Sequence, residues 1–219
     1  MLFRSNGDVF AFQVANPETG IIQNQNIVTG LLACDATASG ARVSLPKNWA
    51  SAAFEAKSWG GPTGISFLAL NNERDWSYPL PHVGAEKSPG TYSLPLLVGA
   101  AIALEEFVVD REKKDAEILR LNKIIRSELS QFAIPEPIGM PHLISIGFAD
   151  TNGEMLVRQL DEVGIYVETG SACSADDLRP SRTLAAMGLP NNGNLRITLH
   201  DETTEAEVYE LVKRIAACA

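Results

Sequence analysis

Cys173 lies between small residues in the polar segment VETGSACSADDLRPS, which begins at Val167. A thiolate is a strong nucleophile, and an exposed cysteine in a segment without apolar periodicity can reach a bound substrate. The alternative is a small buried side chain, which is the commoner fate of a free cysteine. The polar composition of the segment argues against burial and favours a nucleophile on a loop.

Two further residues, Lys57 and Asp35, have side chains that could take part in chemistry. Lys57 lies in the turn-like stretch FEAKSWGGPTG, and a lysine amine that is neutral in its pocket can bind a carbonyl compound as an imine and move protons. The common alternative is a solvated surface lysine. Asp35 follows the apolar run TGLLAC, where a carboxylate often caps a turn.

Composition limits the classes of protein to which the chain can belong. With 219 residues, 45% of them hydrophobic and 21% charged, it has the composition of a soluble globular protein. A net charge of −9 argues against nucleic acid or an anionic membrane as partner. No signal peptide or membrane span is evident, which predicts a cytoplasmic protein. Cys34, Cys173 and Cys218 form no CxxC or Cys/His cluster, so neither disulfides nor a metal site is expected.

The first half of the chain reads as the sheet of an α/β domain. Short apolar runs at 9–15, 27–36, 51–56 and 64–70 are separated by turn residues. They are continuous rather than alternating, which predicts strands covered on both faces in a parallel sheet. We assign residues 1–95 to this domain.

The second half changes to helical periodicity. Residues 96–134 predict a long connecting helical segment with a bend near Val109-Asp110, and residues 135–219 predict a small α+β domain. Within it, 142–150, 164–170 and 194–200 read as strands and 153–164 as a helix. A last helix begins at a capping box formed by Thr204 and Glu207.

The order of short motifs along nearly the whole chain resembles the cysteine desulfurases, enzymes of the class V aminotransferase group that depend on pyridoxal 5'-phosphate (PLP). The motifs are VANPETGIIQ, CDATASG, AKSWGGPTGISFLAL, SPGTYSLPLLVG, LISIGFADTNGEMLVRQLDEVGIYVETGSACS, RPSRTLAAMGLP and LRITLHDETTEAEV. The resemblance implies the type I fold of PLP-dependent transferases. This chain would form part of the large domain, with a mainly parallel sheet, followed by the small carboxy-terminal domain.

The resemblance also implies roles for individual residues. Asp35 would keep the cofactor's ring nitrogen protonated, and Asn16 would lie near the ring hydroxyl. Thr91 would reach the phosphate across a dimer interface. Arg196 would bind the substrate α-carboxylate through a bidentate pair. Cys173 would attack the sulfur of L-cysteine, leaving a persulfide on the enzyme and releasing alanine.

The lysine turn leaves two alternatives open. The family pattern is histidine-lysine, two residues and then Gly-Pro, which places Ser58 where the cofactor-binding lysine is expected and Lys57 one residue earlier. Either the turn absorbs this offset and Lys57 forms the imine, or the chain makes no covalent bond to PLP. Ala38 replaces a glutamine that contacts the ring, and Glu55 replaces a phosphate-binding serine.

Three functions therefore remain as hypotheses. The first is a PLP-dependent cysteine desulfurase, a homodimer connected with sulfur transfer to an acceptor protein and with iron-sulfur cluster assembly. The second is an inactive homologue that acts as a scaffold or subunit, and the third is another class V activity, such as an aminotransferase or selenocysteine lyase. The family's amino-terminal blocks have no counterpart here. A separate polypeptide would supply them, or the chain is a fragment.

Overall fold

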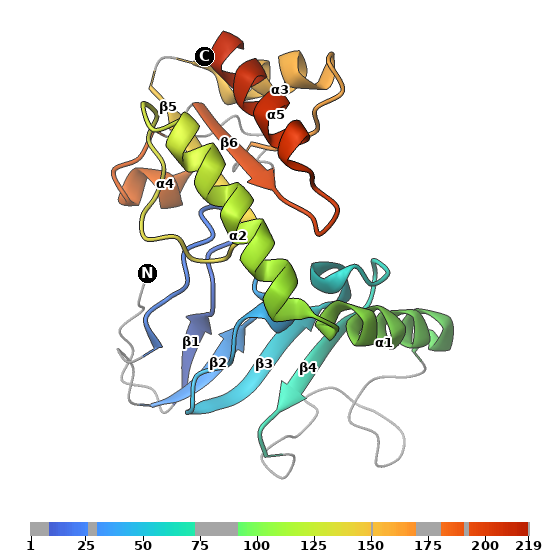
Figure 1. Cartoon of the computed structure of the whole chain (residues 1–219). Coiled ribbons are helices and arrows are strands. Elements are labelled where there is room, and N and C mark those ends of the chain that lie inside the picture. The colour runs from blue at the N-terminus through green and yellow to red at the C-terminus, as the bar shows by residue number, and fades with distance from the viewer. Residues whose placement is uncertain are drawn as a thin grey trace. The chain divides into compact units, whose positions relative to one another are not determined.

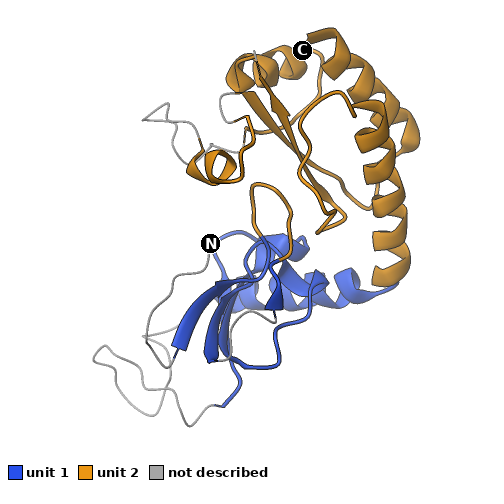
Figure 2. Cartoon of the chain, turned by 90° about the vertical axis from the view of Figure 1, so that its left-hand side faces the viewer, with its two compact units in different colours: residues 1–15, 23–110 blue, residues 16–22, 111–219 orange. Residues whose placement is uncertain are grey.

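The computed structural model describes residues 9–25, 30–72, 92–149, 151–169, 181–190 and 193–218 (Figure 1). The chain divides into two compact units (Figure 2): unit 1 is residues 1–15 with 23–110, and unit 2 is residues 16–22 with 111–219. The short segment 16–22 follows a strand of unit 1 in sequence but belongs to unit 2. Among the described residues, no helix is both long enough and apolar enough to span a membrane.

Unit 1 is built on a four-stranded sheet in which the strands follow one another in chain order. The first three strands are parallel, and the fourth is antiparallel to the third. The four predicted strands and the mainly parallel sheet are thereby confirmed. The strands are β1 (Val9–Gln13), β2 (Leu31–Asp35), β3 (Trp49–Glu55) and β4 (Ser66–Leu70).

Burial in this sheet alternates along the strands. Phe12, Leu32, Cys34 and Ala52 are buried in one cluster, whereas Leu31 is 51% exposed. The continuous apolar sequence predicted cover on both faces, and in the part of the unit that the structure describes this expectation is wrong, since strand residues such as Leu31 are exposed. The runs contain small and apolar residues on both sides of the strands, so the sequence alone does not show which side is buried.

Two helices follow the sheet and are separated by a sharp break. Helix α1 (Leu94–Val108) belongs to unit 1 and helix α2 (Arg111–Glu128) to unit 2. Between them Asp110 has φ = 53°, a left-handed conformation that interrupts helical hydrogen bonding. The predicted bend near Val109-Asp110 is thus confirmed as a complete break.

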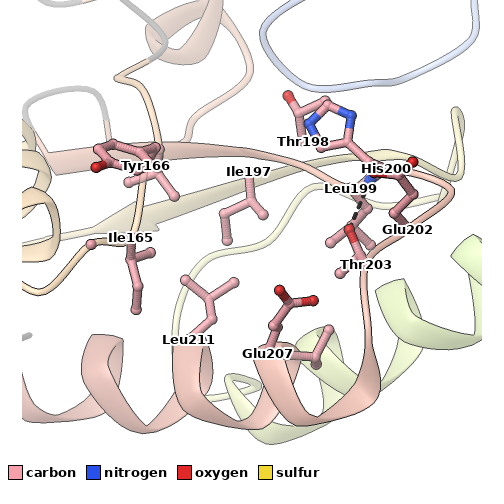
Figure 3. Close-up of a pocket in the computed structure, with 13 residues that line it drawn as sticks. Ile165, Tyr166, Ile197, Thr198, Leu199, His200, Glu202, Thr203, Glu207 and Leu211 are labelled. Carbon is pink, nitrogen blue, oxygen red and sulfur yellow. Dashed lines mark hydrogen bonds between the residues drawn. The ribbon is translucent and has the colours of Figure 1, made fainter.

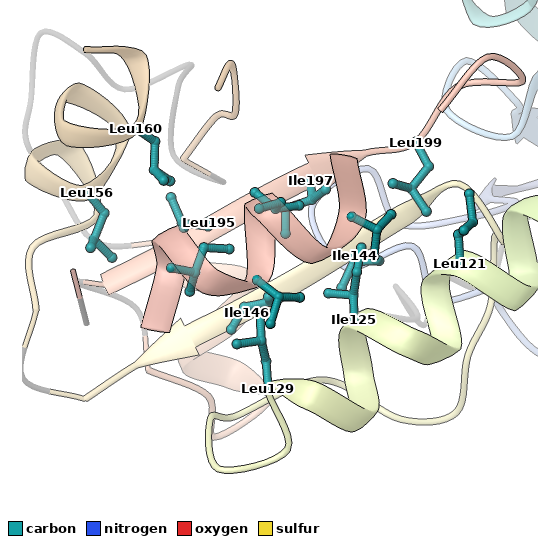
Figure 4. Close-up of a cluster of buried hydrophobic side chains, with 14 of the residues drawn as sticks. Leu121, Ile125, Leu129, Ile144, Ile146, Leu156, Leu160, Leu195, Ile197 and Leu199 are labelled. Carbon is teal, nitrogen blue, oxygen red and sulfur yellow. The ribbon is translucent and has the colours of Figure 1, made fainter. Parts of the chain in front are cut away.

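Unit 2 is a two-stranded antiparallel sheet, β5 (Leu143–Phe148) with β6 (Gly193–Thr198), packed against helices. Side chains from α2, α3, α5 and both strands meet in one hydrophobic core (Figure 4). All six residues of β5 are buried, and helices pack against the sheet that β5 forms with β6. The remaining helices are α3 (Gly153–Asp161), α4 (Arg182–Ala186) and α5 (Glu205–Cys218).

Local signals place the helix starts in unit 2. Asn152 caps α3 by accepting hydrogen bonds from the amides of Glu154 (2.9 Å) and Met155 (3.2 Å). At α5, the Thr204 amide donates to Glu207 Oε2 (2.7 Å) and the Glu207 amide donates to Thr204 Oγ1 (3.3 Å). The predicted capping box is confirmed.

The strand expected at 164–170 does not form over its described residues, and that prediction is wrong. Only Glu168 pairs, through a single antiparallel bridge to Arg196. Tyr166, two residues earlier, is 83% exposed. The bridge nevertheless fixes Glu168 against the edge of β6.

Candidate functional site

In unit 1, Asp35 is the last residue of β2, at the edge where the three parallel strands end. Its Oδ1 accepts hydrogen bonds from the Thr37 amide (3.0 Å) and the Thr37 hydroxyl (2.6 Å). Its Oδ2 makes no hydrogen bond to any described residue, and the side chain is exposed. One carboxylate oxygen is therefore fixed, and the other is available to a protonated nitrogen of a ligand.

Lys57 and Ser58 lie in a 3-10 turn, Ala56–Trp59, directly after β3. The Lys57 side chain is 61% exposed, and its Nζ forms an ion pair with Glu55 Oε2 at 3.4 Å. Ser58 instead donates its hydroxyl to the Glu55 carbonyl at 2.8 Å. A Cβ on Gly40 would lie only 2.5 Å from Ser58 Oγ, so Ser58 faces the interior. The turn presents Lys57 to solvent and directs Ser58 inward.

Long-range contacts hold this turn in place. The Trp59 indole is 6% exposed and donates from Nε1 to the Ala100 carbonyl of α1 at 3.1 Å. Arg42 donates from Nη1 to the Ser58 carbonyl at 3.3 Å, and its guanidinium lies 4.6 Å from the centre of the Phe107 ring. Nothing in the local sequence indicates that Trp59 or Arg42 supports the turn, and our sequence analysis missed both.

In unit 2, Asn16 organises the turn that follows β1. Its Oδ1 accepts hydrogen bonds from the amides of Glu18 and Thr19, both at 2.9 Å, and from the Thr19 hydroxyl at 3.1 Å. Gly20 has φ = 75°, and a Cβ there would lie 3.1 Å from the Leu143 carbonyl oxygen of β5. The turn needs glycine at this position because the left-handed backbone and the close approach both disfavour a side chain.

Arg196 lies on β6 opposite Ser145 of β5. Its backbone amide donates to the Glu168 carbonyl (2.6 Å) and its carbonyl accepts from the Glu168 amide (3.2 Å). Its Nη2 also forms an ion pair with the Glu168 carboxylate, and its Nη1 donates to the Pro17 carbonyl at 3.3 Å. The structure therefore brings Arg196 to the Asn16 turn, although the two are far apart in sequence.

The predicted site residues thus lie in two groups that we describe separately. Asp35, Lys57 and Ser58 belong to unit 1, and Asn16 and Arg196 belong to unit 2. Cys173 and Thr91 lie outside the described residues. In the described ranges no cluster of three or more His, Cys, Asp or Glu residues could hold a metal ion.

The other two cysteines differ in burial. Cys34 is 4% exposed, and desolvation raises the pKa of its thiol to about 11. Cys218, in the last turn of α5, is partly exposed. A buried thiol that stays protonated is a poor nucleophile. Cys34 is therefore excluded as a thiolate near neutral pH.

Unit 2 also has a groove of about 370 Å³ that the sequence did not indicate (Figure 3). It lies between residues 164–167, β6 and the start of α5, where the expected third strand fails to pair. Ile165, Ile197 and Leu211 contribute apolar surface, and polar side chains including Glu202 and Glu207 also line the groove. Arg196 is not among its lining residues.

The family model described as aminotransferase class-V matches residues 4–211. The chain therefore belongs to the class V aminotransferase family, whose members are PLP-dependent enzymes. The predicted family resemblance is confirmed.

Curated relatives carry the name cysteine desulfurase. One is the cysteine desulfurase IscS of Dictyoglomus turgidum, 30% identical over 163 residues, which are 68% of this chain and 40% of that enzyme. The cysteine desulfurase IscS 1 of Archaeoglobus fulgidus is 28% identical over 229 residues, covering 96% of this chain and 60% of that protein. The chain thus spans only about 40% to 60% of the length of these relatives.

Solved structures confirm the predicted fold class. A NifS-like protein superposes with a TM-score of 0.80 at 27% identity, covering 95% of this chain and 60% of that one. The cysteine desulfurase CsdA of Escherichia coli, at 18% identity, superposes with a TM-score of 0.75 over 96% of this chain and 59% of its own. The chain therefore has most of one type I PLP-transferase fold but not its full length.

Proposed function

We propose that this chain is part of a cysteine desulfurase that removes sulfur from L-cysteine, giving alanine and a persulfide on Cys173. The observation that carries the proposal is the placement of Arg196 beside the Asn16 turn in unit 2. A guanidinium held at a strand edge is suited to a substrate α-carboxylate, because its planar donors match the two carboxylate oxygens.

The residues of unit 1 fit PLP in part. The unbonded Oδ2 of Asp35 suits a protonated ring nitrogen, and the exposed amine of Lys57 suits a carbonyl group. Ser58 is less suited, because its hydroxyl is already donated to the Glu55 carbonyl. PLP, when bound, supplies an electron sink for the substrate carbons.

The chain's own residues then have distinct tasks in the proposed reaction. Arg196 orients the substrate carboxylate, and Lys57 carries protons to and from the substrate carbon. The Cys173 thiolate attacks the substrate sulfur, so that an S–S bond forms as the carbon–sulfur bond breaks. The electron pair of the broken bond stays with the carbon, which takes up a proton and becomes the methyl group of alanine.

A second candidate is a non-catalytic subunit that retains the family fold. The ion pairs of Lys57 with Glu55 and of Arg196 with Glu168 favour it, because both proposed ligand-binding cations already have a carboxylate partner. We further propose a homodimer and an acceptor protein for the sulfur. Sedimentation of the purified chain with and without PLP tests the dimer.

The experiment that separates the two candidates is alanine release from L-cysteine by protein incubated with PLP. A desulfurase develops the visible absorption of bound PLP, loses it in Lys57→Ala and keeps it in Lys47→Ala, an exposed lysine of the same unit. Alanine release should disappear in Cys173→Ser. Protein that stays colourless and releases no alanine contradicts the desulfurase and favours the subunit. Keto acids and selenocysteine, tested alongside, separate the other class V activities.

A further inference from the structure

Glu168 and Arg196 are joined both through the backbone and through the side chains. The two backbone hydrogen bonds, at 2.6 and 3.2 Å, fix residue 168 to the edge of β6 whatever its side chain. The carboxylate of Glu168, whose side chain is 59% exposed, then reaches Nη2 of Arg196, whose side chain is 23% exposed. The chain therefore places one of its own carboxylates on the guanidinium to which we assign substrate binding.

The geometry of a guanidinium makes the position of this contact important. A carboxylate can bind bidentately either to Nη1 and Nη2 together or to Nε and Nη2 together. Both arrangements use Nη2, the nitrogen that Glu168 occupies. Nη1 is further committed to the Pro17 carbonyl at 3.3 Å. Because Nη2 carries two hydrogens, an incoming carboxylate either displaces Glu168 from this nitrogen or binds through the other hydrogen, next to the negative charge of Glu168; both weaken its binding.

We propose that Glu168 occupies the carboxylate site of Arg196 in the absence of ligand and so sets the affinity of this arginine for carboxylate ligands. The inference rests on the proposed function for the role of Arg196. The ligand class is the carboxylate of a small amino or organic acid. Because Glu168 belongs to the same chain as Arg196, its effective concentration at Arg196 is constant. It therefore weakens the binding of every carboxylate ligand by the same factor.

The size of the effect follows from exposure. An ion pair with one partner 59% exposed is weak, so its removal should strengthen carboxylate binding by about twofold to fivefold, not by orders of magnitude. Glu168→Gln removes the charge and retains the shape and the backbone bridge. The matched control is Glu154→Gln in unit 2, which breaks the exposed ion pair of Glu154 with Arg158 and changes the net charge equally.

The test is a titration of the full chain with propionate, followed by the arginine Nε–Hε signals in NMR spectra of ¹⁵N-labelled protein. Arg196→Gln identifies the signal, and propionamide serves as the uncharged analogue. We expect propionate to shift the Arg196 signal and to bind Glu168→Gln about twofold to fivefold more tightly than the wild type. Glu154→Gln should bind as the wild type does, and propionamide should cause no shift. Glu168→Ala repeats the measurement with a shorter side chain.

Three results would overturn the proposal. They are unchanged or weaker binding in both Glu168 variants, equal tightening in Glu154→Gln, and the absence of any propionate effect at Arg196. The titration needs neither PLP nor turnover, so it separates this inference from the proposed function. Tighter propionate binding in Glu168→Gln without alanine release from the wild type contradicts the desulfurase alone.

Discussion

The buried thiol of Cys34 gives a quantitative prediction about which cysteine can react. Cys34 lies on β2 inside the unit 1 core, and desolvation raises its pKa from 9.0 to about 11. Since each pKa unit is a factor of ten in the acid–base equilibrium, the thiolate fraction at pH 8 falls by about 100-fold. Limited access of the reagent acts in the same direction. We therefore expect alkylation of Cys34 to be at least about 100-fold slower in the folded than in the unfolded chain.

The assay is a time course of iodoacetamide labelling at pH 8, quantified for each cysteine-containing peptide by mass spectrometry. Partly exposed Cys218 provides the internal reference, and the same reaction in guanidinium chloride gives the rate of each unfolded thiol. Labelling of the native chain at Cys34 as fast as at Cys218 would refute the burial argument. The same peptides, analysed after incubation with PLP and L-cysteine, should carry no persulfide on Cys34.

Four changes in stability are expected, each measured by urea unfolding. Because the pKa of Cys34 is raised in the folded state, its contribution to stability is fully present below pH 9 and is lost as pH rises through 11. Over that range, the free energy of unfolding of the wild type should fall by about 3 kcal/mol more than that of Cys34→Ala. Ile146→Ala, at a fully buried position of β5, should cost about 2–5 kcal/mol, and a cost below about 1 kcal/mol would contradict its burial. Thr204→Ala and Asn152→Ala each remove a helix cap and should lower the free energy of unfolding by about 0.5–2 kcal/mol. An unchanged free energy of unfolding in either variant would contradict that cap.

Sequence patterns predicted the elements whose signals are local. The apolar runs of unit 1 gave four strands, and the capping box gave the start of α5. The break between α1 and α2 was likewise indicated near Val109-Asp110. In each case the signal lies in residues that are neighbours in sequence, so propensity and periodicity suffice.

Features that depend on distant contacts were not predictable in this way. The segment 16–22 reads as an ordinary turn, yet it belongs to unit 2 because Gly20 approaches Leu143 and its carbonyl accepts from the Met140 amide at 2.8 Å. The run 164–170 has strand-like composition but pairs only at Glu168, since pairing depends on the partner strand as well as on the run itself.

The candidate site shows the same division between local and distant signals. The motif order identified the family, and Asp35 lies at a strand end as the sequence indicated. The stretch around Lys57 was expected to be turn-like, and the 3-10 turn found there is held by a distant contact of Trp59 with Ala100 that the sequence did not indicate. Cys173 and Thr91 stay predictions.

The two cations assigned to ligand binding are each compensated by a glutamate, Lys57 by Glu55 and Arg196 by Glu168. Binding of an anion to either cation is therefore an exchange of one ion pair for another. In an exchange, dissolved salt screens the pair that breaks about as much as the pair that forms. Carboxylate binding at Arg196 should consequently depend only weakly on ionic strength in the wild type. It should depend more strongly in Glu168→Gln, where the ligand binds an uncompensated charge.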